Sequence, residues 1–294
     1  EAEMEKTIGV SGHSRIIEYG VGKFNEECRS IVLRYTSEWK KAITRTGRWV
    51  DFENGYRTMD KNYMESVWWV FKTLYEKGLI YEGYNVLPYS PKLASPLSNM
   101  EVSLGGYKDV VDQAVTVRFK IDGTENSYFL AWTTTPWTLP SNLALAVGPD
   151  IDYVEVSDEA DGAHYYLAKN LLGKYWKDGK GCTIVREVKG TDLVGMTYEP
   201  LFPYFASLKE KGAFQVVTAD YVTVEDGCGI VHTASGFGED DYNTRKSKIP
   251  GCPVVCPVDE ECRFTSEVPE WQGVFVKDAD KSIIEWLKNN GKLV

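Results

Sequence analysis

Four threonines stand within the stretch from Trp132 to Asn142, which reads WTTTPWTLPSN and follows a segment typical of a β-strand. A buried strand favours an unbroken apolar run, because a hydroxyl taken from water without a hydrogen-bond partner costs about 1–3 kcal/mol. The pattern therefore indicates a site that uses these hydroxyls as donors and acceptors. The candidates are the three consecutive threonines, Thr133, Thr134 and Thr135.

A second stretch, from Glu225 to Tyr242, reads EDGCGIVHTASGFGEDDY. A short apolar strand ends at His232 and runs into a glycine-rich turn that leads to three acidic residues. This histidine and the carboxylate of Asp241 could therefore converge at one strand end. A lone histidine is more often a structural residue, and an acidic run is more often a solvated face or a helix N-terminus. Taken alone, the stretch leaves both interpretations open.

Two amphipathic helices are predicted before these motifs, because apolar residues recur at spacings of three and four. The first ends before Gly47, and the second has Asp60 as its N-cap and Gly78 after its last turn. We interpret both apolar stripes as core. Their members are Phe24, Cys28, Ile31, Val32, Tyr35, Trp39 and Ile43 in the first helix, and Met64, Val67, Trp68, Phe71, Leu74 and Tyr75 in the second.

A loop-rich connector is predicted at residues 83–106, where Pro, Ser, Asn and Gly accumulate. We expect residues 1–105 to form a helical arm with this connector, and residues 106–294 to form a second domain. Short β-like runs recur between turn signals in that second domain. They are Val115–Ile121, Tyr128–Trp132, Tyr153–Val156, Tyr165–Ala168, Thr183–Val188, Phe214–Val217 and Gly229–His232.

Many short strands joined by long connections favour a barrel, or a twisted sheet closed on itself. A last helix is expected before Gly291, with Asp280 as its cap and an apolar face that holds Ile283, Ile284 and Leu287. The predicted fold class is α+β, with a β-barrel-like domain, surrounding helices and a preceding helical arm.

The composition is that of a globular protein, with 43% hydrophobic and 26% charged residues. The chain starts at Glu1 with Met4 inside it, which is typical of a piece of a larger protein. Six scattered cysteines favour reduced thiols and a cytoplasmic location, and the spacing of Cys252, Cys256 and Cys262 is not that of a zinc site. The net charge of −10 disfavours general nucleic-acid binding, since that rests on Lys and Arg.

The two motifs together resemble the signature segments of the editing domain of the isoleucyl-tRNA synthetases, which are class Ia enzymes. WTTTPWTLPSN is similar to the isoleucine version of the first segment, and GIVHTASGFGEDD is similar to the second. The flanking sequences resemble the family over almost the whole chain. The family's two synthetic-site segments, His-x-Gly-His and Lys-Met-Ser-Lys-Ser, are absent from this sequence, so we expect no ligase activity from this chain alone.

Three features depart from the family pattern. Ser235 stands where the family usually has Pro, and Cys228 stands where Thr is common. The connector lacks the paired cysteines of zinc-bearing bacterial relatives, so no metal is expected in it. No cofactor is implied by the resemblance.

The resemblance implies hydrolysis of a valine ester on the 3′ end of tRNA(Ile). One missing methylene changes binding by only about 1–3 kcal/mol, and isoleucine against valine is the standard example of this limit, so a second site must remove the smaller amino acid. Thr134, Thr135, His232 and Asp241 are the implied catalytic residues, with Asp241 as counter-ion of the α-ammonium group. The implied substrate-binding residues are Thr133, Trp137, Asn142, Ala234 and Phe237.

His232 is expected to narrow the pocket so that isoleucine is excluded; a general-base role is less favoured, because the sequence shows no partner that would orient it. The expected partners are tRNA(Ile) carrying valine and the remainder of the synthetase, with no membrane. The alternative is a module that docks tRNA or a partner without hydrolysis. A metal-dependent hydrolase is disfavoured, because the sequence shows no clustered ligands.

Overall fold

The computed structural model describes residues 2–294. Its contacts divide the chain into two compact units, Glu1–Tyr84 and Asn85–Val294. The connector from residue 85 onward therefore packs with the barrel unit. The functional division expected at residues 105 and 106 stays a prediction.

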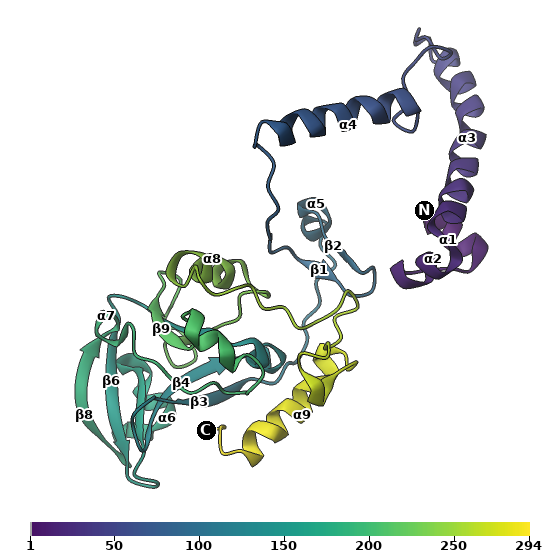
Figure 1. The fold of residues 1–294 in the computed structure, drawn as a ribbon. Helices are drawn as coiled ribbons and strands as arrows, with labels where there is room; N and C mark the ends of the chain where they lie inside the picture. Colours follow the sequence, from purple (N-terminus) through teal and green to yellow (C-terminus); the bar gives the residue numbers. More distant parts are fainter. Residues whose placement is uncertain (1) are drawn as a thin grey trace. The chain divides into compact units, whose positions relative to one another are not determined.

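The first unit is helical, as predicted for the arm (Figure 1). Its elements are α1 (Ala2–Ile8), α2 (His13–Tyr19), α3 (Val21–Arg45) and α4 (Lys61–Glu76). Asp60 stands at the N-cap of α4, although its side chain makes no capping bond. Gly78 follows the helix with φ +69°, which an L side chain rarely adopts.

The prediction that the arm's apolar stripes form a core is wrong for this chain. On α4, Met64, Val67, Trp68, Phe71, Leu74 and Tyr75 are all exposed. On α3, Val32, Tyr35 and Trp39 are exposed, and Phe24 is buried. Amphipathic periodicity places apolar residues on one face of a helix, but within the described part of the arm no element covers these faces.

The second unit begins with the connector, which contains the two-stranded ribbon β1 (Tyr89–Ser90) and β2 (Ser95–Pro96) and the short helix α5 (Asn99–Ser103). Ser98 and Glu101 form a capping box at the start of α5. The Tyr89 hydroxyl donates a hydrogen bond to the Glu260 carbonyl over 2.9 Å, which ties the connector to the rest of the unit.

All seven predicted strands form, within two residues of the expected bounds. The eight-stranded sheet runs β8-β6-β7-β4-β10-β5-β9, and β3 pairs with β4. One strand of the sheet, β5, is missing from the prediction because its residues form a short apolar run without alternation. The strands are β3 (Val115–Lys120), β4 (Ser127–Thr133), β5 (Ala144–Val147), β6 (Asp152–Asp158), β7 (His164–Ala168), β8 (Cys182–Lys189), β9 (Gln215–Thr218) and β10 (Ile230–Thr233).

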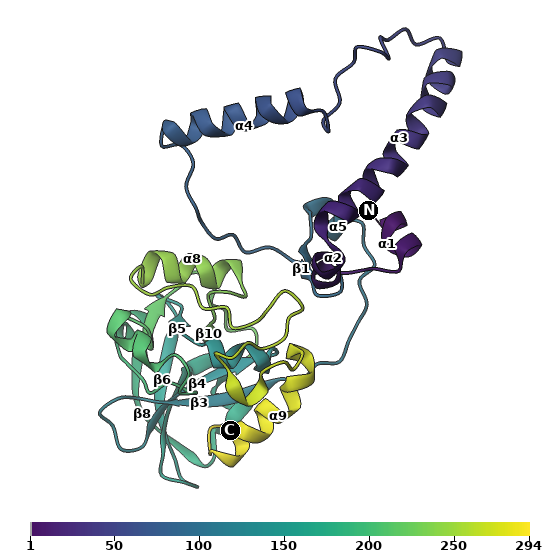
Figure 2. The same cartoon turned by 45° about the vertical axis from the view of Figure 1, so that its right-hand side comes forward.

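The sheet closes on itself through residues 195–199. Thr197 bridges to Gln215 of β9, and Tyr198 bridges to Ile121 at the end of β3. The Glu199 amide donates to the Lys120 carbonyl over 2.8 Å, on the β3 side of the same segment. The predicted α+β fold with a barrel-like sheet is therefore confirmed (Figure 2).

The core lies inside this closed sheet. Its largest fully buried side chains include Phe119, Phe129, Leu145, Tyr153 and Tyr198. The remaining elements are η1 (Pro136–Ser141), η2 (Lys169–Leu171), α6 (Leu172–Tyr175), η3 (Lys177–Gly179), α7 (Gly190–Leu193), η4 (Ala206–Lys211), α8 (Glu239–Lys248), η5 (Pro269–Trp271) and α9 (Val276–Asn289), where η marks a 3₁₀ helix.

Helix α9 lies beside β3, and the residues after it pair with that strand through Val117 and Leu293 (Figures 1 and 2). Its buried face includes Ile283 and Leu287, as predicted. The prediction that Asp280 caps this helix is wrong, because the helix begins one turn earlier, at Val276. The Asp280 carboxylate instead accepts a hydrogen bond from a distant backbone amide, described below.

Candidate functional site

The two motifs meet at one edge of the barrel, where β4 and β10 end side by side. The two strands are parallel, with Val231 opposite Trp132. Because adjacent parallel strands end at the same edge of a sheet, the turn after β4 and the loop after β10 lie next to each other. The sequence alone did not show that the two strands are neighbours.

The threonine hydroxyls form a hydrogen-bonded row along this edge. Thr133 Oγ1 lies 3.1 Å from Thr135 Oγ1, which lies 3.2 Å from Thr138 Oγ1. The Thr138 hydroxyl donates to the Thr135 carbonyl over 2.8 Å. Thr133 and Thr138 are buried, Thr135 is half-buried, and Thr134 is exposed to solvent. Each buried hydroxyl of the row thus has a partner.

His232 is held between the two motifs by both of its ring nitrogens. Its Nε2 lies 2.8 Å from Thr138 Oγ1, and its Nδ1 lies 3.3 Å from Asn142 Nδ2. Since the Thr138 hydroxyl proton goes to the Thr135 carbonyl, Nε2 must donate to Thr138. Nδ1 is then the acceptor, because the Asn142 amide nitrogen can only donate.

Asn142 is fixed in its turn by the barrel. Its Nδ2 also donates to the Ala144 carbonyl over 2.9 Å, and its Oδ1 accepts from the Tyr198 hydroxyl over 2.7 Å. Tyr198 is fully buried in the segment that closes the sheet. The orientation of the imidazole of His232 is therefore determined by β5 and by the closing segment as well as by its own loop.

Burial lowers the pKa of His232 to about 4, so the imidazole is neutral at pH 7. Both nitrogens already have partners, and neither points to an unfilled position. The imidazole is therefore fixed in one tautomer, and its role in a reaction stays a prediction.

Asp241 lies in the first turn of α8, at the end of the loop that follows β10. Its Oδ1 accepts a hydrogen bond from the Ala234 amide over 2.7 Å, and burial raises the pKa of the carboxyl above its ordinary value. Among the side chains that the structure describes, no Lys or Arg forms an ion pair with it. Its second oxygen, Oδ2, lies 2.2 Å from the position that a Cβ atom would occupy if residue 238 were not glycine.

Aromatic rings join the turn to the loop. The Trp137 and Phe237 ring centroids are 4.8 Å apart at an interplanar angle of 74°, an edge-to-face contact. Trp137 Nε1 is buried without a hydrogen-bond partner in the described residues. Ala234 is buried, at 2% exposure, and its carbonyl accepts the Phe237 amide over 3.0 Å. Trp137, Ala234 and Phe237 therefore belong to the same cluster as the polar residues.

The two residues that depart from the family pattern have partners here. The Ser235 hydroxyl, fully buried, accepts from the Val255 amide over 3.4 Å. The Cys228 thiol donates to the Leu130 carbonyl over 3.0 Å. Both side chains tie the loop to neighbouring backbone, which accounts for their burial.

Three residues of this cluster were not assigned to the site from the sequence. Thr138 belongs to the first motif but stands apart from the three consecutive threonines, after two apolar residues. Its membership of the motif is the only sequence signal for it. Tyr198 carries no sequence signal, since its role depends on barrel closure. The Asp280 carboxylate accepts a hydrogen bond from the Trp137 amide over 2.9 Å. Its position near the start of a helix indicates a cap in the sequence, which is not the role it has in the structure.

No group of three His, Cys, Asp or Glu side chains that could hold a metal ion occurs in the part of the chain that the structure describes. In the same residues no helix is long and apolar enough to cross a membrane. All six cysteines are free, and Cys252 and Cys256 differ in exposure, the first buried and the second exposed.

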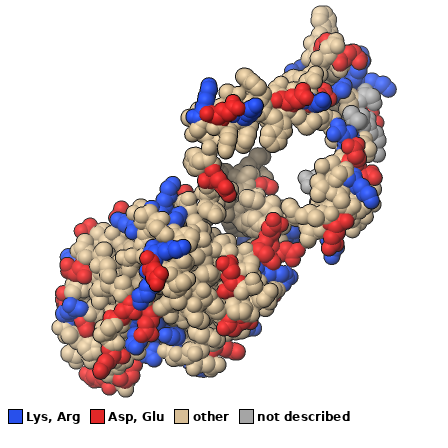
Figure 3. All heavy atoms as spheres, in the orientation of Figure 1, with Lys and Arg blue, Asp and Glu red and all other residues tan. Residues whose placement is uncertain are grey.

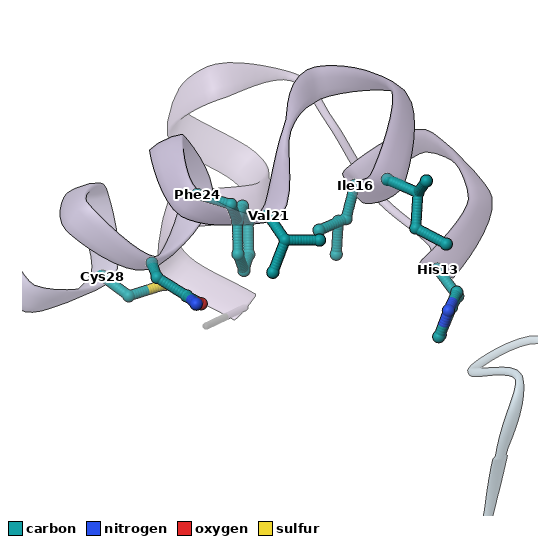
Figure 4. A pocket seen from close by; sticks show the side chains of 7 residues that line it. His13, Ile16, Val21, Phe24 and Cys28 are labelled. Atoms are coloured by element: carbon teal, nitrogen blue, oxygen red, sulfur yellow. The ribbon is translucent and has the colours of Figure 1, made fainter.

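A hollow of ≈ 370 Å³ lies in the first unit, between α2 and the start of α3 (Figure 4). It contains apolar side chains and a single histidine but no acidic group, so it offers little for chemistry. It is lined by His13, Ile16, Ile17, Val21, Phe24, Asn25 and Cys28. The barrel edge, with its half-buried carboxylate and its hydroxyl row, is the better candidate site.

Comparisons with known proteins agree on one family. The family model of the tRNA synthetases class I (I, L, M and V) matches residues 1–282. The isoleucine-tRNA ligase of Treponema denticola is 53% identical over 99% of this chain, and that of Protochlamydia amoebophila is 54% identical over 100%. The cytoplasmic isoleucine-tRNA ligase of Saccharomyces cerevisiae is 48% identical over 99% of the chain.

The chain spans 28% to 29% of the length of these relatives. Among solved structures, the editing domain of the P. falciparum cytosolic leucyl-tRNA synthetase is similar with a TM-score of 0.49 and 12% sequence identity. That similarity covers 62% of this chain and 99% of the other.

Proposed function

The chain belongs to the class I tRNA synthetases (I, L, M and V), and from this premise we propose that its barrel edge is an editing site of an isoleucine-tRNA ligase. The proposed reaction is hydrolysis of the ester between valine and the terminal adenosine of tRNA(Ile). The proposed substrate-binding and catalytic residues are those of the cluster where β4 and β10 end.

The observation that carries the proposal is the Asp241 carboxylate, which is half-buried and has no cationic partner in the described residues. It is held by the Ala234 amide, two residues after His232, whose ring contacts the hydroxyl row. A carboxylate in such a position is stabilised by a cationic ligand, because a charge-assisted hydrogen bond is about twice as strong as a neutral one. The α-ammonium group of an aminoacyl ester is a ligand of this kind. Oδ1 is held by the Ala234 amide, so Oδ2 is the oxygen available to it.

The hydroxyl row then supplies positioning. Hydrolysis adds a water oxygen to the ester carbonyl carbon, breaks the bond to the ribose oxygen, and passes a water proton to that oxygen. Thr134 is exposed and Thr135 is half-buried, so both hydroxyls can reach a bound ester or an attacking water. Orientation of this kind can supply much of the rate of such a reaction without a strong general base.

The apolar side of the cluster would discriminate between valine and isoleucine. The neutral His232 ring and the edge-to-face pair of Trp137 and Phe237 form rigid surfaces. Because close-packed interiors respond to the volume of a single methylene, a rigid wall suits the admission of valine and the rejection of isoleucine. In this proposal Asn142 acts by holding His232 and does not touch the substrate.

The remainder of the synthetase and tRNA are the proposed partners. The exposed apolar faces of α3 and α4 are surfaces that such a protein would cover. Lys and Arg are interspersed with Asp and Glu on the face of the barrel unit seen in Figure 3, and the net charge is −10. Most of the affinity for tRNA should therefore come from other domains.

The test is a deacylation assay of the chain with valyl-tRNA(Ile), comparing the unaltered protein with Asp241→Ala and Asp240→Ala. Truncating one partner of a buried charged pair costs about 2–5 kcal/mol, so Asp241→Ala should slow deacylation by between tens and thousands of fold. Asp240 is exposed, and its loss should be mild.

Equal losses for the two variants, or none for Asp241→Ala, would remove the carboxylate from the mechanism. No deacylation by the unaltered chain, together with binding of valyl-tRNA(Ile), would favour the alternative of a non-catalytic docking module.

A further inference from the structure

The turn that follows the threonines is the 3₁₀ helix η1, and the side chain of its N-cap residue makes no capping hydrogen bond. Thr135 stands at the N-cap position of η1, where a threonine hydroxyl normally accepts a hydrogen bond from an amide in the first turn. Here it makes no such bond, because the hydroxyl lies in the row between Thr133 and Thr138. Pro136 has no amide proton, so the Trp137 amide is the first donor of the helix.

Asp280 of α9 supplies the acceptor that Thr135 does not. Its Oδ1 accepts the Trp137 amide over 2.9 Å, across 143 residues of sequence. The Asp280 side chain is only 13% exposed and lies 3.7 Å from Lys277 Nζ, one turn earlier on the same helix. Helix α9 itself is anchored in the core by Ala279, Ile283 and Leu287, which are fully buried.

We propose that Asp280 is a positioning residue of the candidate site: it caps η1 from another element and thereby leaves the Thr135 hydroxyl to the row that reaches His232. The inference rests on the proposed function. Without Asp280, the Trp137 amide would lack its acceptor, and the nearest hydroxyl at the N-cap is that of Thr135. Recruiting it would break the row between Thr133 and Thr138.

The consequence is specific to chemistry at the site. A displacement of about 1 Å of a positioning group can cost about a hundredfold in rate, even when binding is preserved. Loss of Asp280 should therefore lower the rate of the hydrolytic step more than the affinity for the ester. A residue that only fastened α9 to the barrel would lower thermal stability without this selective effect.

The experiment measures deacylation of valyl-tRNA(Ile) by the chain carrying Asp280→Ala, Asp280→Asn or Asp278→Ala. Asp280→Ala should reduce kcat by tenfold or more with KM changed less than threefold. Asp280→Asn should stay within about threefold of the unaltered protein, because its amide oxygen can still accept the Trp137 amide. Asp278 is exposed on the same helix, so Asp278→Ala controls for the loss of an acidic residue there.

A double-mutant cycle gives the decisive comparison. If Asp280 acts through the Thr135 hydroxyl, Asp280→Ala should have little further effect once Thr135→Val has removed that hydroxyl. The inference would be overturned if the loss in kcat of the double variant equalled the product of the two single losses. An unchanged kcat for Asp280→Ala, or equal losses for Asp280→Ala and Asp280→Asn, would also overturn it.

Hydrogen exchange separates the inference from the proposed function. The Trp137 amide should be protected in the unaltered protein and in Asp280→Asn, and should exchange at least tenfold faster in Asp280→Ala. If the unaltered protein does not deacylate valyl-tRNA, the proposed function fails, and this measurement still decides the capping role. If Asp280→Ala does not fold, the Asn variant is decisive: loss of Trp137 protection in it would overturn the inference, and retained protection would support it.

Discussion

The barrel edge and the helical arm depart from ordinary burial in opposite directions. At the barrel edge, polar side chains such as Thr133, Asn142 and His232 are buried. In the arm, large apolar side chains such as Trp39 and Trp68 are exposed, at 67% and 68%. The difference between the two regions lies in their partners.

At the barrel edge each of these buried polar groups has a hydrogen-bond partner within the chain, so its burial is compensated. The exposed rings of the arm have no cover in the described residues, and contiguous exposed apolar surface is typical of an interaction site. These buried polar side chains are thus held in place by the chain itself. Exposed apolar stripes indicate a surface that another segment or protein completes.

The largest expected effect is in the barrel core. Phe119 is fully buried and packs edge-to-face on Tyr198, with ring centroids 5.3 Å apart. Phe119→Ala should lower the free energy of unfolding by about 3–5 kcal/mol, through lost burial and a cavity. Urea unfolding followed by circular dichroism measures it, and a loss below about 1 kcal/mol would show that the closed sheet is not the stable unit.

The next largest effect is the pH dependence of stability that the buried imidazole of His232 causes. The pKa of His232 is lowered from 6.5 to about 4 in the folded chain, so the unfolded state binds the proton first as pH falls. Stability from this group is therefore complete above about pH 6.5 and is lost as pH falls toward 4, by roughly 3 kcal/mol in all.

The measurement is urea unfolding between pH 7 and pH 4, in the unaltered chain and in His232→Leu. The leucine variant should lose most of this pH dependence, while other groups that titrate in the range contribute equally to both proteins. A pH slope that is the same in the two proteins would contradict a neutral, buried imidazole.

A smaller effect is expected at Gly238, whose backbone is ordinary extended chain with φ −148°. Alanine is therefore allowed by the backbone, but its Cβ would lie 2.2 Å from Asp241 Oδ2. Gly238→Ala should displace the carboxylate and slow deacylation by about tenfold or more, about 1.4 kcal/mol. Gly173→Ala is the matched control, because its Cβ meets nothing within 4 Å and its φ is ordinary. Equal rates for both variants would show that the carboxylate tolerates displacement.

The smallest effect is expected in the arm. Trp68→Ala should change the free energy of unfolding of this chain by less than about 0.5 kcal/mol, because the ring is already exposed. In a complete synthetase the same substitution should cost several times more if the arm's apolar face is covered there. Thermal unfolding of the two proteins gives the comparison, and equal costs in both would remove the contrast between the two regions.

Much of the fold could be predicted from the sequence, because strand periodicity and turn residues are local signals. Val115 and Val117 alternate with polar residues, and the strand they predict is β3. β5 has no such alternation, since Leu145 and its neighbours are buried on both faces of the sheet. Periodicity also marks an apolar face without showing whether anything covers it, which is why the arm was assigned to the core.

For the site, the sequence by itself determined which residue types are present: the hydroxyls after β4, the histidine at the end of β10 and the carboxylate that begins α8. Tertiary structure decided their connections. Only barrel closure brings Tyr198 to Asn142, and only the packing of α9 brings Asp280 to the Trp137 amide. The physical reason is that a hydrogen bond depends on distance and angle between particular atoms, and contacts across 56 or 143 residues are set by packing of whole elements.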